Sequence, residues 1–128
     1  MTHHNIWQGE VVGTLNTHDC DPRYGTFSYG LAIYRDQQHK GYASESIRLV
    51  LRYFFQELRY QKATVNIYTF NEASIKLHER LGFQHEGCLR RMHYTGGKYH
   101  DMRILGLTAE EFSVKEAHET RFHPGAET

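Results

Sequence analysis

Cysteine is scarce in this sequence, and no sign of charge is in surplus. The 128 residues include two cysteines, Cys20 and Cys88, too few and too widely separated to predict a disulfide framework or a zinc ribbon. Lys plus Arg and Asp plus Glu number 15 each, so near neutral pH no overall basic field attracts nucleic acid or a membrane surface. The ten histidines could add positive charge below about pH 6.5. The composition therefore favours a partner recognised by shape, and we expect no nucleic acid among its partners.

Long hydrophobic runs are also missing. Residues 1–5 lack the apolar centre of a signal peptide, and no run approaches the roughly 20 apolar residues that span a bilayer. We therefore expect a cytoplasmic protein with no membrane partner. The histidines show no His-x-x-x-His or Cys/His spacing typical of zinc ligands, so we also expect no metal site.

The sequence before residue 70 predicts a hairpin, a long helix and a further strand. Residues 11–16 and 25–34 have the pattern of two antiparallel strands, joined by the turn-rich residues 19–23. Residues 64–69 are mostly β-branched or aromatic and predict a strand parallel to the second of these. Between them, a helix over about 41–60 is predicted because apolar residues recur at helical spacing. Its sheet-facing residues are Ala43, Ile47, Val50, Leu51, Phe54 and Leu58.

The sequence from residue 71 predicts a shorter helix. Asn71 suits the position that caps the start of a helix over 71–81, and Gly82 suits the left-handed position just past its end. We expect one buried stripe on this helix, formed by Ala73, Leu77 and Leu81.

A second hairpin is predicted after this helix, followed by a tail. Strands over 83–94 and 99–107 flank the Gly96-Gly97 pair, which is typical of a tight hairpin turn. The polar residues 113–128 show no core pattern. We therefore expect one domain over residues 1–112 and a disordered tail over 113–128.

The junction between the first predicted hairpin and the long helix carries the strongest functional signal. It has the sequence Gln38-His39-Lys40-Gly41-Tyr42-Ala43. A glycine there lets the backbone approach a bound anion, and the first helical turn has N–H groups without an internal partner. With the helix dipole, these groups form an anion site, which points to a phosphorylated cofactor. The alternative is a glycine that serves only a tight turn.

Two segments resemble the signatures of the GNAT superfamily of acetyl-CoA-dependent N-acyltransferases. Residues 38–43 resemble its pyrophosphate loop, and residues 71–83 resemble its second signature, a helix opened by Asn and closed by Gly-Phe. The Gly-x-x-Arg of residues 87–90, the glycine turn and Asp101 resemble the branch of ribosomal-protein N-terminal acetyltransferases. The resemblance covers about residues 9–112.

The resemblance implies an α/β GNAT fold. Its mixed, mostly antiparallel sheet has two central parallel strands that splay apart, with two flanking helices. Members of this kind usually begin with a strand, one or two helices and another strand, and the chain resembles a form shortened by these elements. An uncovered strand edge is adhesive, so self-association, for example as a homodimer, is expected.

The resemblance also implies the coenzyme site. The pantetheine arm of acetyl-CoA would pair with the backbone of Leu31, Ala32 and Ile33, and Asn71 would bond that arm or cap its helix. The pyrophosphate would meet the N–H groups of the loop. These belong to His39, Lys40, Gly41, Tyr42, Ala43 and Ser44.

Two residues are candidates for protonating the departing thiolate. His78 stands where many family members carry a tyrosine, and its ordinary pKa of about 6.5 suits proton transfer. Ser74 stands where relatives in the ribosomal-protein branch have a serine proposed as the donor. The alternatives are a histidine that packs beside the thioester and a serine that satisfies the first helical turn. Asn71, Ser74 and His78 share one helical face.

The general base stays open. Asn66 stands where some relatives have a glutamate, and an amide cannot take a proton at neutral pH. Glu86, Asp101 or a held water remain candidates, and Asp101 is also suited to a structural ion pair with nearby arginines. The resemblance implies transfer of an acetyl group to a primary amine, either a peptide N-terminus or a small amine. The alternative is a non-catalytic coenzyme-A-binding or assembly module.

Overall fold

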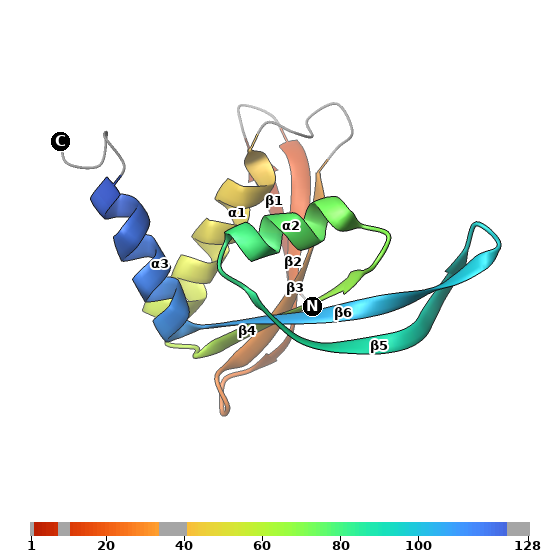
Figure 1. Ribbon diagram of the computed structural model, residues 1–128. Helices are drawn as coiled ribbons and strands as arrows, with labels where there is room; N and C mark the ends of the chain where they lie inside the picture. Colours follow the sequence, from red (N-terminus) through yellow and green to blue (C-terminus); the bar gives the residue numbers. More distant parts are fainter. Residues whose placement is uncertain (1, 8–10, 34–40, 123–128) are drawn as a thin grey trace. The chain divides into compact units, whose positions relative to one another are not determined.

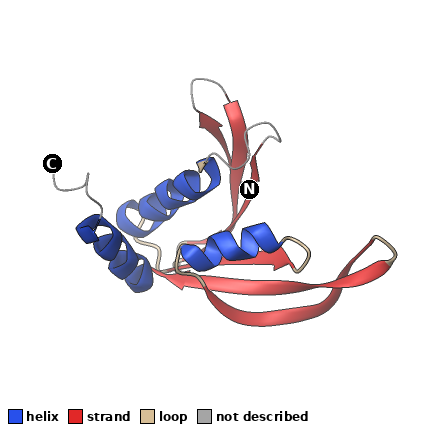
Figure 2. Cartoon of the chain, turned by 45° about the horizontal axis from the view of Figure 1, so that its top comes forward, coloured by secondary structure: helices blue, strands red, loops and turns tan. Residues whose placement is uncertain are grey.

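The computed structural model describes residues 2–7, 11–33 and 41–122. By its internal contacts the chain divides into two compact units, Met1–Val65 and Asn66–Thr128. Strand β4 (Lys62–Tyr68) runs from the first unit into the second. Figure 1 names the elements, and Figure 2 distinguishes helices from strands.

The first unit contains three antiparallel strands and the start of a parallel one. β2 (Val11–Asp21) pairs on one side with β1 (Thr2–Trp7) and on the other with β3 (Thr26–Ile33), both antiparallel. The predicted hairpin is therefore confirmed, whereas β1 was not anticipated. β4 pairs parallel to β3, in a register that runs from Thr26 opposite Lys62 to Ser28 opposite Thr64. This confirms the predicted parallel strand.

The long helix of the first unit changes from α-helical to π-helical hydrogen bonding near its C-terminal end. α1 spans Tyr42–Arg52 and continues as the π-helical segment η2 (Tyr53–Glu57). The Leu58 N–H reaches back five residues to the Tyr53 carbonyl at 3.0 Å. The predicted sheet-facing residues Ile47, Leu51 and Phe54 are buried, whereas Leu58 is 42% exposed because it lies past the wide turn.

The core of the first unit is rich in aromatic rings. Phe27 of β3 stacks on Phe54 with ring centroids 4.1 Å apart and meets Phe55 edge-on at 5.9 Å. Tyr60 closes the group, 5.1 Å from Phe54. The other buried side chains described in this unit come from alternate strand positions and one helix face; they are Leu15, Thr17, Tyr29, Ile47, Leu51, Ala63 and Val65.

The second unit contains a helix and a long hairpin that follow the end of β4. The helix α2 spans Glu72–Arg80, and the hairpin consists of β5 (Gln84–Thr95) and β6 (Lys98–Thr108), paired antiparallel. Within the sheet, β6 lies between β4 and β5, so β5 is one of the two edge strands. Both views show α2 over the hairpin, whose turn lies beyond the helix. These elements confirm the predicted helix and hairpin.

The hairpin turn depends on its glycine pair. Gly96 and Gly97 both have positive φ, 62° and 80°, the combination that a two-residue turn matched to the strand twist requires. Thr95 and Lys98 are partners directly across the turn. The prediction of a tight turn at these glycines is therefore confirmed.

The expectation of a disordered tail from residue 113 is corrected. Helix α3 spans Ala109–Phe122 and buries Phe112. Its start is a capping box, in which Thr108 Oγ1 accepts from the Glu111 N–H at 3.2 Å and Glu111 Oε1 accepts from the Thr108 N–H at 2.9 Å. The expected boundary after residue 112 therefore falls inside a helix, and the single domain over 1–112 stays a prediction.

The predicted buried stripe of α2 is partly wrong. Ala73 is exposed and Leu77 half-buried, whereas Leu81 is buried as expected. The helix buries His78 instead, which is 4% exposed. The helix therefore turns its histidine face inward, where the His78 ring packs against the Phe83 ring. No helix in the described ranges is long and apolar enough to cross a membrane.

Candidate functional site

Helix α1 begins at a glycine in a left-handed conformation. Gly41 has φ 80° and ψ 1°, and its carbonyl accepts the first helical hydrogen bond from the Glu45 N–H at 3.1 Å. Among the residues that the structure describes, no side-chain hydrogen bond caps this helix start. The N–H groups of Tyr42, Ala43 and Ser44 therefore occupy the positions that an α-helix leaves without an internal acceptor. An added Cβ on Gly41 would meet no atom of the described part of the chain within 4 Å.

The loop preceding this helix lies outside the described residues. The predicted coenzyme contacts His39 and Lys40 belong to it, as does Gln38. Of the predicted loop residues, the structure therefore places Gly41, Tyr42, Ala43 and Ser44.

The predicted pantetheine-binding residues occupy the end of β3. Leu31 and Ala32 face Leu15 and Thr14 in the register with β2, and Ile33 faces Gly13. The register between β3 and β4 stops at Ser28, five residues before β3 ends. Leu31 is half-buried and Ala32 exposed. Short parallel pairing of this kind agrees with the expectation of diverging strands.

Asn71 caps helix α2. Its Oδ1 accepts a hydrogen bond from the Ser74 N–H at 3.3 Å, while its carbonyl accepts from the Ile75 N–H at 3.2 Å. The structure therefore confirms the capping role predicted for Asn71. A bond to the pantetheine arm stays a prediction.

The two candidate proton donors lie together on α2. His78 Nδ1 is 2.8 Å from the Ser74 carbonyl oxygen and 3.5 Å from Ser74 Oγ. Since a carbonyl oxygen only accepts, Nδ1 carries the proton, and the neutral ring has Nε2 as its acceptor. Burial lowers the pKa of His78, opposed by the smaller effect of the Ser74 carbonyl, which favours the protonated ring. Geometry and burial together therefore favour a neutral His78.

The closing turn of α2 holds His78 from its other side. The Gly82 N–H donates to the Glu79 carbonyl and the Phe83 N–H to the His78 carbonyl, both at 3.0 Å. This is a Schellman motif, and Gly82 has φ 102°. The Phe83 ring meets the His78 ring edge-on at 5.0 Å. Gly82 and Phe83, the pair that ends the GNAT-like helix signature, therefore hold the His78 imidazole in place.

The candidate bases are placed on the second hairpin. Asp101 Oδ1 accepts from the backbone N–H of Arg91 at 2.9 Å, and the Cys88 thiol lies 3.8 Å from Oδ2. Asp101 thus has a structural role, but the group it holds is a backbone amide and not an arginine side chain. Its carboxylate forms no ion pair with an arginine in the described residues. Glu86 lies at a break in the β5–β6 register.

The base role of these residues stays a prediction, and Asn66 is exposed. Within the described residues, no group of three or more His, Cys, Asp or Glu is arranged to hold a metal ion.

Sequence reasoning missed an exposed aromatic surface on the same hairpin. Tyr94 and Tyr99 are cross-strand partners with ring centroids 5.0 Å apart, and the Arg91 guanidinium lies 4.3 Å from the Tyr99 centroid. The signal was available, because cationic and aromatic residues stand on both sides of the Gly96-Gly97 pair, and a two-residue turn there brings the two sides together.

Comparison with known proteins identifies the family. A family model described as an acetyltransferase (GNAT) domain matches residues 3–84. The SPbeta prophage-derived uncharacterized N-acetyltransferase YokL of Bacillus subtilis is 49% identical over 104 residues, which are 81% of this chain and 59% of that protein. A second B. subtilis protein, named "Putative ribosomal N-acetyltransferase YdaF", is 27% identical over 107 residues, 84% of this chain and 58% of that protein.

A solved structure shares the fold. A mutant of the spermidine N-acetyltransferase SpeG from Vibrio cholerae superimposes with a TM-score of 0.80 at 20% identity, covering 86% of this chain and 66% of that one. The expected α/β GNAT fold is thereby confirmed. The chain spans less than two thirds of the length of each of these two curated relatives. With its family model covering well over half of its residues, the chain belongs to the GNAT acetyltransferase domain family.

Proposed function

We propose that this chain transfers an acetyl group from acetyl-CoA to a primary amine. The observation that carries the proposal is the start of α1, where a left-handed Gly41 precedes a helical turn that no side chain of the described residues caps. Such a turn presents N–H groups and the positive end of the helix dipole to an anion. The diphosphate of the coenzyme is an anion that this turn can bind.

The transfer proceeds by direct attack. The amine lone pair forms a bond to the thioester carbonyl carbon, the carbon–sulfur bond breaks, and the coenzyme leaves as a thiolate that takes a proton. The amine nitrogen loses a proton to a base. Holding the two reactants in attack geometry can supply about 7 to 11 kcal/mol of the barrier reduction.

Ser74 and His78 have different roles in this proposal. Because His78 Nδ1 donates to the Ser74 carbonyl, it is not available to accept from the Ser74 hydroxyl. The lowered pKa of His78 makes an imidazolium donor scarce near neutral pH. We therefore assign proton donation to the Ser74 hydroxyl and a positioning role to His78, which anchors the first turn of α2 through its hydrogen bond.

Two acceptor classes are consistent with the family. One relative is named a putative ribosomal N-acetyltransferase and another a spermidine N(1)-acetyltransferase. A peptide N-terminus and a polyamine both offer a primary amine. Acceptor choice is measured by release of free thiol from acetyl-CoA with peptides and polyamines offered in parallel.

Coenzyme binding is tested at Gly41 with an isosteric pair. Asp and Asn both tolerate a positive φ better than other residues, so each preserves the helix start. Gly41→Asp places a negative charge where the diphosphate would bind, whereas Gly41→Asn places a neutral amide of the same shape. In titration calorimetry with acetyl-CoA we expect the Asp variant to lose binding and the Asn variant to retain more of it. Equal affinity of the Asp variant and the parent would contradict the proposed site.

The alternative is a module that binds coenzyme A without turnover. We retain this alternative because no residue has been assigned as the general base. Both functions require coenzyme binding, so calorimetry does not separate them. Thiol release with any amine supports the transferase, and tight binding without release supports the module.

A further inference from the structure

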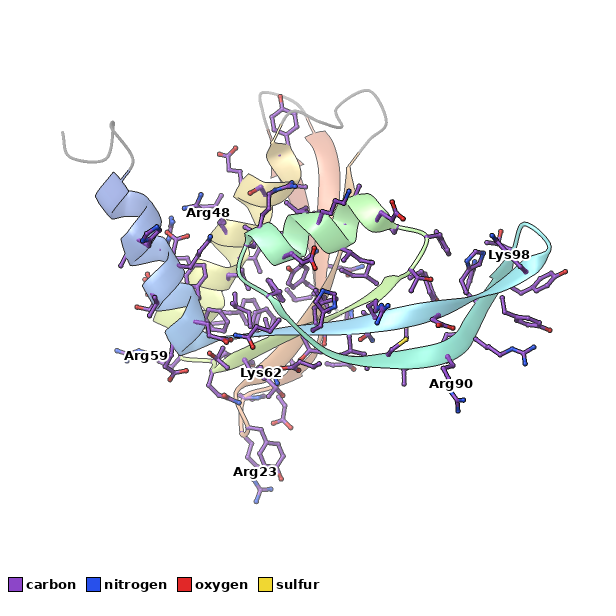
Figure 3. The ribbon with its side chains drawn as sticks, viewed as in Figure 1. Arg23, Arg48, Arg59, Lys62, Arg90 and Lys98 are labelled. Atoms are coloured by element: carbon purple, nitrogen blue, oxygen red, sulfur yellow. The ribbon has the colours of Figure 1, made fainter. Side chains whose placement is uncertain are left out.

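The tip of the second hairpin concentrates positive charge that the whole chain does not show. Over residues 87–100 there are three cationic side chains, Arg90, Arg91 and Lys98, and no Asp or Glu, although the chain as a whole has zero formal charge. All three are exposed. Figure 3 shows Arg90 and Lys98 directed away from the ribbon. Counting Asp101 directly after it, this stretch still has three cations against one acid, so the local field at the tip is positive.

Two exposed tyrosines accompany these charges. Tyr94 is 61% and Tyr99 is 56% exposed, well above what a packed ring retains. The two rings meet at 62° with centroids 5.0 Å apart, and Arg91 covers part of Tyr99. Exposed ring faces beside a guanidinium form a surface on which flat aromatic groups can stack.

The arginine of this surface is held in place by a bulge. Arg91 has φ 58°, and the β5–β6 register breaks between Leu89 and His93. Asp101 Oδ1 accepts the Arg91 N–H at 2.9 Å, which anchors this uncommon backbone conformation. The acidic residue next to the tip therefore holds the backbone that delivers the guanidinium to Tyr99.

A second arginine–tyrosine pair in the first unit provides the contrast. Arg23 lies 5.8 Å from the centroid of Tyr24, which is 67% exposed. Asp21 is in the same turn and accepts from the backbone N–H groups of both residues. Asp19 is exposed two residues before it. This pair offers a similar ring and cation within a turn where two acids outnumber the one arginine.

We propose that the hairpin tip, residues 89–100, binds single-stranded RNA, a local exception to the expectation of no nucleic-acid partner that the charge of the whole chain supports. Arg90, Arg91 and Lys98 contact the phosphates, and unpaired bases stack on Tyr94 and Tyr99. The exposed rings favour RNA over an acidic peptide, because a peptide carboxylate gains nothing from a stacking surface. The Tyr hydroxyl groups can bond the ribose 2′-hydroxyl, which favours RNA over DNA. This surface is independent of the proposed acetyl transfer.

The proposal is tested by fluorescence anisotropy with the full chain and a labelled oligouridylate of about 12 nucleotides, without acetyl-CoA. Replacing both rings with Tyr94→Leu and Tyr99→Leu should weaken binding about fivefold or more per ring. Tyr94→Phe and Tyr99→Phe keep the stacking faces and should stay close to the parent. Arg91→Ala should reduce the slope of log affinity against log salt by about 0.7.

The matched control replaces the other pair, with Arg23→Ala and Tyr24→Leu, and should leave RNA affinity unchanged. Inorganic polyphosphate, polyglutamate and the DNA oligonucleotide of the same sequence complete the panel. RNA binding that depends on the rings supports the proposal. Polyanions that compete as well as RNA, DNA that binds as tightly, or affinity unaffected by the Leu variants would each overturn it. Thermal unfolding shows whether each variant is folded.

Discussion

The Nδ1–H of His78 donates to the carbonyl oxygen of Ser74, one helical turn earlier, at 2.8 Å. This bond fixes the proton on one ring nitrogen while burial disfavours a second proton. The ring is therefore a neutral, oriented group inside the second unit. The contribution of this ring to the stability of the fold therefore depends on pH.

The stability of the protein should depend on pH through His78. Burial lowers the folded-state pKa of His78 below the unfolded value of about 6.5, so the unfolded chain takes up a proton first as pH falls. The stabilising contribution of the neutral ring is therefore complete above about pH 6.5. It declines as pH falls toward the lowered folded pKa.

Urea unfolding between about pH 7.5 and pH 5 measures this dependence. The variant His78→Gln does not titrate, so its free energy of unfolding should fall less over this range. His85→Gln, which removes an exposed histidine beside Glu79 on the same unit, is the comparison variant. An identical decline in the parent and the His78 variant would show that other groups dominate.

Removing the cap of α2 should destabilise the protein modestly. Asn71→Ala removes the acceptor for the Ser74 N–H, a loss that typically costs about 1 kcal/mol. Asn71→Asp keeps an acceptor oxygen at the same place and should retain most of the stability. Chemical unfolding of both variants gives the difference. If the coenzyme affinity of Asn71→Asp drops while its stability holds, Asn71 also contacts the coenzyme.

Gly82 should tolerate substitution poorly because of its backbone. A Cβ there would meet ordinary contacts, 3.6 Å from Leu107 Cδ1 as the nearest, so space is available. The φ of 102° is what an L side chain disfavours, at about 1 to 2 kcal/mol. Gly82→Ala should therefore lower the free energy of unfolding by about this amount.

Gly87→Ala is the matched control for Gly82. Its Cβ would have a nearest neighbour at 3.8 Å, and its φ lies outside the left-handed region. Comparable losses at the two glycines would mean that side-chain contacts, and not the left-handed turn, determine the cost.

Asp101 should prove structural when it is replaced by its amide. Asp101→Asn keeps an oxygen that accepts the Arg91 N–H, so the bulge and the catalytic rate should both persist. Asp101→Ala removes that acceptor and should cost about 1 to 2 kcal/mol. If Asp101 is the general base, the Asn variant should lose about 10²- to 10⁴-fold in turnover while remaining folded. Steady-state rates and unfolding curves for the two variants decide between these roles.

Local patterns predicted most of the elements that carry the site. Asn71 and Gly82 bound α2 as expected, because capping and left-handed positions have strong residue preferences. Gly96 and Gly97 likewise determine the hairpin turn. These features depend on a few neighbouring residues, which is why one sequence was sufficient to predict them.

Features that depend on distant packing were not predicted. The burial of His78 arises from its contact with Phe83, which a helical pattern of apolar residues does not include. The bulge at Arg91 depends on Asp101 from the neighbouring strand. Helix α3 was missed for a different reason, since its capping box from Thr108 to Glu111 was readable in the sequence.

The wide turn at the end of α1 gives the chain a place where its length can change without disturbing the sheet. One extra residue is accommodated where Leu58 reaches back to Tyr53. Deleting a single residue from Tyr53–Glu57 would restore ordinary four-residue spacing and leave the inward alternation of Ala63, Val65 and Ile67 on β4 as it is. Homologues one residue shorter between this helix and β4 would then keep the same strand face inward.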